Sequence, residues 1–212
     1  MSTLKFTGKQ FKALMANCIE RNKLVKGSAE NLHYPVLSAG GKLIFTDSYT
    51  MVSVETSLVT VQSADKQYVD GGLMRLDFDL WEKILVKDKF EIDEIGIYKN
   101  GKLFGTWKYV NTATSSGLAD IVDTAKNKAA SGTMDDMRYY YQNFCLRGKY
   151  LSRMTDIAEA FDCCVNVIPC INVVPNSENE PFGKRYQHTE SFCEFPYCSY
   201  NICGVVMPMK RS

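Results

Sequence analysis

A pattern of a short strand, an amphipathic helix and further strands occurs three times along the chain, and this repeat constrains the fold most. The first unit begins with the strand Leu4–Thr7 and a helix from Gly8 to about Asn22, which the Thr7 side chain can cap. The second has an apolar segment at Leu73–Leu76 and a helix within residues 77–90. The third has a strand in NFCLRG and a helix in KYLSRMTDIAEAF. Such units predict an internally repeated α+β protein.

In each predicted helix, apolar residues recur at helical spacing and define a buried face. These inward residues are Phe11, Leu14, Met15 and Cys18 in the first helix, Phe78, Trp81, Ile84 and Leu85 in the second, and Leu151, Met154, Ile157 and Phe161 in the third.

Alternating apolar residues predict strands near Leu32–Leu37, Lys42–Thr46 and Met51–Val61. The dipeptide Asn100-Gly101 lies between two further runs and predicts a hairpin turn, because both residues tolerate positive φ angles. Late in the chain, CCVNVIPCINVV predicts a strand, PNSENEPFGKR a polar loop, and CSYNICGVVMPM a returning strand.

The segment from Asn111 to Gln142 differs from the rest, with small and polar residues and only weak helical periodicity. We place a boundary or a partly ordered connection here. The prediction is therefore a first domain of residues 1–110 and a second, shortened domain of residues 111–212.

The length and composition of the chain are those of a globular protein. With 212 residues, 45% hydrophobic and 23% charged, the chain is long enough to bury a core. No apolar run approaches the roughly 20 residues that span a bilayer, and the start MSTLKFTGKQF lacks the apolar stretch of a secretion signal. We expect a cytoplasmic protein, without a membrane partner, whose eight cysteines are reduced.

The cysteines do not predict a metal centre. No CxxC pair is present, and the nearest histidine, His188, stands five residues before Cys193. The main interpretation is that the cysteines are small, buried, apolar side chains. A metal-binding or thiol-reactive protein is kept as the alternative. Six of the cysteines fall between residues 163 and 203: Cys163, Cys164, Cys170, Cys193, Cys198 and Cys203.

No catalytic set is recognisable, so we expect neither an enzyme nor a cofactor. The histidines His33 and His188 are isolated, and the chain has no GxSxG and no glycine-rich phosphate loop. Asp47 could be a lone catalytic acid, but an aspartate at a strand end more often accepts backbone N–H bonds in a turn.

Two basic segments are more informative than the net charge of +1. Residues 1–26 contain six Lys or Arg and one acidic residue, and residues 138–153 contain four Lys or Arg and no acidic residue. Both include a predicted amphipathic helix, and a basic helix face attracts phosphates without reading sequence. The alternative is a solvated helix surface on which Arg153 pairs with Asp156.

Several segments resemble the bacterial DNA polymerase III beta subunits, the sliding clamps. TDSYTM after GGKLIF resembles the family's ATDGHRL strand and turn, and VVMPMKR resembles its carboxyl end, VVMPMRL. GGLMRLDFDLWEKIL resembles the second helix of the middle domain, SGLADIVDT stands at the linker position, and FCLRGKYLSRMTDIAEAF resembles the final helix. These matches follow the family order across most of the chain, and the family's first domain has no counterpart.

The resemblance implies a noncatalytic processivity factor with helices on an inner, DNA-facing side and antiparallel sheets outside. In the family, the turn and the terminal strand wall an apolar groove for a partner peptide with Gln and Leu-Phe anchors. The family's Gly-His-Arg stands here as Ser48-Tyr49-Thr50, which removes a cation and adds a ring. The implied peptide-binding residues are Thr46, Ser48, Tyr49, Thr50 and Met51 on one wall and Val206, Met207, Pro208 and Met209 on the other.

The implied partners are double-stranded DNA, a DNA polymerase and other clamp-binding proteins, with phage or mobile-element origin suggested by the short length. If each chain holds two complete domains, the closed ring is a homotrimer joined through edge strands. The alternative is an interaction protein that binds partner peptides without encircling DNA. The residues expected to contact DNA phosphates are Lys9, Lys12, Lys23, Arg147, Lys149 and Arg153.

Overall fold

The computed structural model describes residues 3–23, 28–38, 40–58, 73–110, 116–131, 146–174 and 185–207. In chain order its elements are β1 (Leu4–Thr7), α1 (Gly8–Met15), η1 (Arg21–Lys23), η2 (Ser28–His33), β2 (Val36–Leu37), β3 (Lys42–Thr46), β4 (Thr50–Glu55), β5 (Leu73–Phe78), β6 (Lys89–Ile92), β7 (Gly96–Lys99), β8 (Lys102–Val110), α2 (Ser116–Ser131), α4 (Gly148–Ala160), β9 (Asn166–Val174), β10 (Arg185–Glu194) and β11 (Ile202–Val206).

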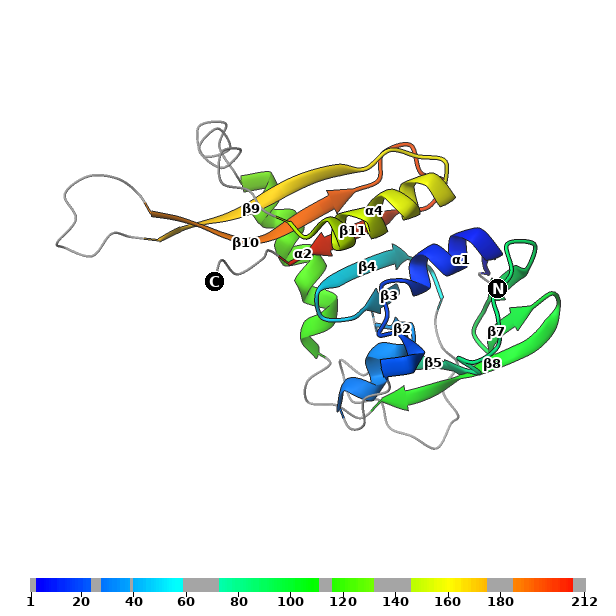
Figure 1. Cartoon of the computed structure of the whole chain (residues 1–212). Helices are drawn as coiled ribbons and strands as arrows, with labels where there is room; N and C mark the ends of the chain where they lie inside the picture. The colour runs from blue at the N-terminus through cyan, green and yellow to red at the C-terminus, as the bar shows by residue number, and fades with distance from the viewer. Residues whose placement is uncertain are drawn as a thin grey trace.

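Within these residues, 11 strands form one sheet in the order β1-β6-β7-β8-β5-β2-β3-β4-β11-β10-β9, and all the neighbouring strands are antiparallel. The β9 and β10 pair lies at one end of the molecule, and β7 and β8 lie toward the other (Figure 1). The protein is therefore α+β, as predicted, with a large antiparallel sheet.

Helices pack on both faces of the sheet. Phe11 of α1 and Met154 of α4 belong to one core with Phe45 of β3. On the other face, Val122 of α2 belongs to a second core with Ile44, the residue next to Phe45. Because neighbouring strand residues point to opposite faces, β3 contributes to both cores.

The strands of the two predicted domains share this sheet. Strand β4 pairs with β11 from Thr50↔Val206 to Val54↔Ile202. Helix α1 also contacts α4. The division at residues 110 and 111 stays a prediction, and any boundary there would be crossed by these contacts.

The first predicted helix begins where expected and ends early. Thr7 caps it, and a capping box with Gln10 completes its start. It stops at Met15 and not near Asn22, because the Asn17 side-chain amide donates to the carbonyl oxygens of Ala13 and Leu14, both at 3.3 Å. A side chain that satisfies these carbonyl groups ends the helix locally.

The predicted second helix is wrong. Strand β5 continues to Phe78, and turns follow until β6. The Asp79 side chain accepts a hydrogen bond from the amide of Trp81, and that of Asp88 accepts one from Leu85. These local bonds favour turns over a helix. Trp81 is 62% exposed and not inward, so the three-unit repeat does not hold.

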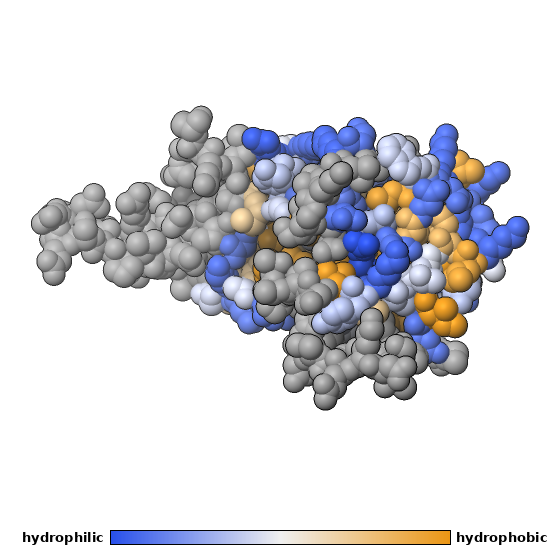
Figure 2. Space-filling view, turned by 90° about the horizontal axis from the view of Figure 1, so that it is seen from below, coloured by the Kyte–Doolittle hydropathy of each residue, from blue (hydrophilic) through white to orange (hydrophobic). Residues whose placement is uncertain are grey.

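Apolar side chains also lie on the surface at this end of the molecule. Figure 2 shows them among polar side chains near β7 and β8. Exposed apolar residues in this part of the chain include Leu85, Val86, Ile95 and Leu103.

Several of the remaining predictions are confirmed. These are the Asn100-Gly101 hairpin, the third helix as α4, and the strands β9 and β11.

Other predictions are corrected. Residues 32–37 form part of η2 and the short β2 instead of one strand, and the predicted strand Met51–Val61 is β4, which ends at Glu55. Helix α2 lies within the segment that we assigned to a boundary, and β10 was not predicted. The residues NFC of the predicted strand NFCLRG lie outside the described residues, and Leu146 and Arg147 precede α4 without strand structure.

Candidate functional site

The turn between β3 and β4 is organised by the carboxylate of Asp47. Its Oδ1 accepts hydrogen bonds from the amides of Tyr49 and Thr50, both at 2.9 Å. Ser48, between Asp47 and Tyr49, has a φ of 75°, in the left-handed region, and its amide donates to Thr46 Oγ1 at 3.2 Å. The turn role predicted for Asp47 is thus confirmed.

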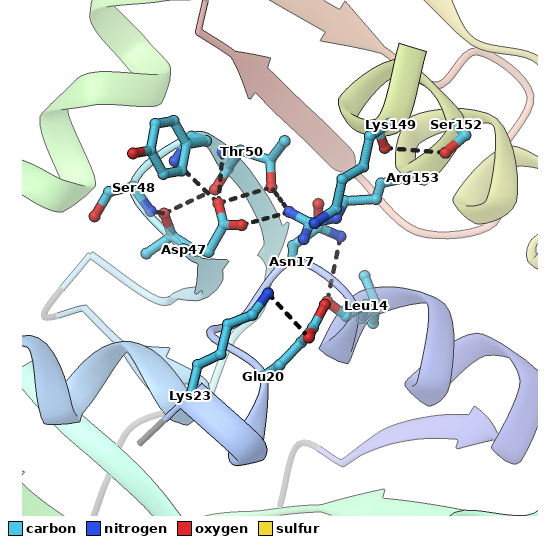
Figure 3. A network of polar contacts seen from close by, with 12 residues as sticks. Leu14, Asn17, Glu20, Lys23, Asp47, Ser48, Thr50, Lys149, Ser152 and Arg153 are labelled. Carbon is cyan, nitrogen blue, oxygen red and sulfur yellow. Dashed lines mark hydrogen bonds and ion pairs between the residues drawn. The ribbon is translucent and has the colours of Figure 1, made fainter. Parts of the chain in front are cut away.

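Helix α4 reaches the same carboxylate through Arg153. The guanidinium Nη1 donates to Asp47 Oδ2 at 2.6 Å and to Thr50 Oγ1 at 2.8 Å. Both side chains of the ion pair are largely buried, with 9% of Arg153 and 12% of Asp47 exposed. Figure 3 shows Arg153 pointing from α4 toward the turn. The alternative partner Asp156 is therefore wrong.

Two tyrosine rings form a second contact between the turn and α4. The rings of Tyr49 and Tyr150 are stacked, with centroids 5.5 Å apart and planes 8° apart. Tyr150 is buried, whereas Tyr49 is 56% exposed. The guanidinium carbon of Arg153 also lies 5.5 Å from the centroid of the Tyr150 ring. The turn therefore presents one face of an aromatic pair to solvent.

The turn and the end of β11 lie side by side, as the resemblance implied. Beyond the β4 and β11 pairing, the amide of Met207 donates to the carbonyl oxygen of Tyr49 at 2.9 Å. Met207 is 41% exposed. We define the Tyr49 surface as the exposed residues Ser48, Tyr49 and Met207.

The structure buries four of the predicted peptide-binding residues and leaves two outside its description. Thr46, Thr50, Met51 and Val206 are buried, so their side chains support the sheet and cannot form the surface. The positions of Pro208 and Met209 lie outside the described residues. Exposure could not be deduced from the sequence, because it depends on which helix covers each strand.

The predicted basic residues divide into three groups. Lys9 and Lys23 form ion pairs with Glu159 at 2.8 Å and with Glu20 at 3.1 Å. Arg153 is turned inward to Asp47, so it is removed from the set of DNA-contacting residues. The remaining predicted residues, Lys12, Arg147 and Lys149, are exposed.

Helices α1 and α4 run antiparallel on their face of the sheet. Lys9, near the start of α1, pairs with Glu159, near the end of α4. Helix α1 contacts α4, and Lys149, after the larger effect of Lys23, contributes to lowering the pKa of Glu20, so the start of α4 lies near the residues that follow α1. Two antiparallel helices therefore form one surface that carries the exposed basic residues.

Most of the described cysteine side chains are buried or half-buried. Burial raises the pKa of Cys18 to about 12 and that of Cys193 to about 12. Cys164 is exposed. In the part of the chain that the structure describes, no group of three or more His, Cys, Asp or Glu residues could hold a metal ion. The predicted absence of a metal stays a prediction.

No family model and no curated protein matches this chain. Among the described helices, none is long and apolar enough to cross a membrane.

Proposed function

We propose that this chain is a noncatalytic, sliding-clamp-like protein that binds a short peptide of a replication partner at the Tyr49 surface. The observation that carries the proposal is the hydrogen bond between Met207 and Tyr49, which places the end of β11 beside the β3 and β4 turn. These are the two segments whose sequences resemble the walls of the family's peptide groove.

The chemistry of the Tyr49 surface supports a peptide with apolar anchors. An exposed tyrosine ring offers a large contact area with little loss of side-chain entropy, and aromatic residues are common among interface hot spots. The thioether of Met207 adapts to different apolar partners. The ring of Tyr49 is already held against Tyr150, so binding would not need to order it.

The antiparallel helices α1 and α4 support a role in contacting DNA. In the proposal they form the inner face of a clamp, where Lys12, Arg147 and Lys149 meet phosphates. Such contacts are independent of sequence and weaken with salt, which would allow sliding. The protein would act in the cytoplasm as a homo-oligomer, a trimer if the chain supplies two clamp domains.

A peptide titration tests the proposal. The probe is a labelled synthetic peptide with a Gln and a Leu-Phe pair, measured by fluorescence anisotropy. We expect Tyr49→Ala and Met207→Ala each to weaken binding about tenfold or more, because each removes an exposed anchor. Tyr109→Ala is the matched control, because Tyr109 is 43% exposed and lies on β8. Equal affinity in all four proteins would remove the peptide site.

A second candidate is an interaction protein that binds the same peptide without encircling DNA. The ion pairs of Lys9, Lys23 and Arg153 favour it, because each engages a cation that DNA would otherwise attract. Binding of the peptide by a monomer with no affinity for duplex DNA would select this candidate.

A further inference from the structure

We propose that Arg153 is a positioning residue for peptide binding, because it holds the β3 and β4 turn in the conformation that presents Tyr49. This inference rests on the proposed function. Arg153 is largely buried, so it does not belong to the Tyr49 surface and would act only through the residues that it contacts.

A single carboxylate joins the helix to the turn. Asp47 accepts the amides of Tyr49 and Thr50 with Oδ1 and the guanidinium of Arg153 with Oδ2. Arg153 also donates to Thr50 Oγ1, the hydroxyl of the first residue of β4 (Figure 3). Arg153 of α4 therefore fixes the orientation of the Asp47 carboxylate. The carboxylate in turn holds the two amides of the turn.

The turn needs such support because its backbone is not in a preferred conformation. Ser48 has a φ of 75°, where a residue with a Cβ atom is uncommon and costs free energy. Such conformations persist when the surrounding contacts determine them. Arg153 supplies a charge-assisted contact, which is stronger and more directional than a neutral hydrogen bond.

Two residues of α4 act on the turn from the same helix face. Tyr150 and Arg153 are three residues apart, a spacing that places side chains next to each other on a helix. Tyr150 stacks on the ring of Tyr49, and Arg153 binds the carboxylate that holds the Tyr49 amide. The Tyr49 carbonyl oxygen accepts the amide of Met207, so a shift of the turn would also alter the second exposed residue of the surface.

The test compares Arg153→Met and Arg153→Lys with wild type. The probe is the labelled Gln and Leu-Phe peptide, and affinity is measured at a temperature at which circular dichroism shows each variant folded. A residue that only stabilised the fold would leave the affinity of the folded protein unchanged. We expect Arg153→Met to bind about tenfold more weakly and Arg153→Lys, which keeps the charge, to recover part of the loss.

A matched control is Lys128→Met, which removes the cation of another ion pair between a helix and the sheet. Lys128 of α2 pairs with Glu190 of β10 at 2.8 Å, with 31% and 13% of the two side chains exposed. We expect its peptide affinity to stay within about twofold of wild type, since it does not contact the turn.

Amide hydrogen exchange provides a readout that does not depend on the peptide. The amides of Tyr49 and Thr50 should exchange about tenfold faster in Arg153→Met than in Lys128→Met, because the turn opens more often without its tether. Unchanged exchange, or equal peptide affinity in Arg153→Met and wild type, overturns the positioning role. Failure of wild type to bind the peptide overturns the proposed function instead, and the exchange result then decides whether Arg153 positions the turn.

If Arg153→Met does not fold, Asp47→Asn provides the same test. Its side-chain oxygen can still accept the two turn amides, but it lacks the charge that binds Arg153. We expect it to bind the peptide several-fold more weakly than wild type. Wild-type affinity and wild-type amide exchange in Asp47→Asn would overturn the inference.

Discussion

The amide of Met207 donates a hydrogen bond to the carbonyl oxygen of Tyr49 at 2.9 Å, so the end of the described chain lies beside a turn about 160 residues earlier. This bond follows the β4 and β11 pairing by one residue. The backbone of the sheet thus holds the exposed side chains of Tyr49 and Met207 next to each other. Substitutions that disturb the sheet or its helices should therefore be distinguishable from substitutions within the Tyr49 surface itself.

The first prediction concerns the start of α1. We expect Gly8→Ala to lower the free energy of unfolding by about 2 kcal/mol, because the new methyl group would overlap backbone atoms. A Cβ atom at Gly8 would lie 1.8 Å from the carbonyl oxygen of Leu85. Urea denaturation followed by circular dichroism measures the change.

Gly148 provides the control, because it is also the first residue of a helix. A Cβ atom there meets nothing within 4 Å. We expect Gly148→Ala to leave the free energy of unfolding unchanged or to raise it by up to about 1 kcal/mol, since alanine is the better helix former. A similar loss in both variants would mean that α1 does not approach Leu85 as described.

Local patterns in the sequence were sufficient for several elements. The cap at Thr7, the Asn100-Gly101 turn and the helical spacing of Met154 and Ile157 each act within a few residues, so they predicted the start of α1, the β7 and β8 hairpin and α4. The same spacing misled between residues 77 and 90. There, Phe78 and Trp81 match a helix, but the Asp79 side chain satisfies the amide of Trp81 and holds a turn.

The candidate site was less accessible to prediction from the residues alone. The ion pair of Arg153 and Asp47 joins residues 106 positions apart, whereas helix spacing favoured Asp156. The burial of Thr50 and Val206 depends on their packing beneath α4, which no local pattern encodes. The proximity of the turn to the last strand was expected from the family resemblance and is seen in the pairing of β4 with β11.

The second prediction concerns DNA. If exposed lysines of the helix pair contact phosphates, Lys12→Ala and Lys149→Ala should each weaken binding to a duplex oligonucleotide and reduce the slope of log affinity against log salt by about 1. Fluorescence anisotropy across a salt series measures both. Lys102→Ala is the control, because Lys102 is exposed at the start of β8 and belongs to neither α1 nor α4.

The outcome at low salt separates the two candidate functions. A wild-type protein that does not bind the duplex even there would contradict the clamp and leave the peptide-binding alternative. Equal slopes in Lys12→Ala, Lys149→Ala and Lys102→Ala would show that the antiparallel helices are not the surface that DNA contacts.

The third prediction concerns assembly. Strands β1 and β9 are the two ends of the described sheet, and end strands carry backbone groups that can pair with another chain. A ring closed through these edges requires a defined oligomer, so we expect a trimer by light scattering at micromolar concentration. A monomer across this range contradicts self-assembly, while it leaves the peptide site untouched.

The fourth prediction concerns stability at alkaline pH. Cys18 is buried, and burial, as the largest of several effects, raises its pKa from an ordinary value of about 9 to about 12. Between these values the unfolded chain loses the thiol proton while the folded protein keeps it. The contribution of Cys18 to stability is thus fully present below about pH 9 and is lost as the pH rises toward 12.

The change that tests this is Cys18→Ala. The free energy of unfolding of wild type should fall more steeply above pH 9 than that of Cys18→Ala, by up to about 1.4 kcal/mol per pH unit. Urea denaturation at a series of pH values measures the slope for each protein. Lysines and tyrosines titrate in both proteins, so their effect cancels when the slope of Cys18→Ala is subtracted from that of wild type. Cys164→Ala is the control, because it also removes a thiol, but one that is exposed. Identical slopes in wild type and Cys18→Ala would contradict the burial of this thiol beside the backbone of Thr46.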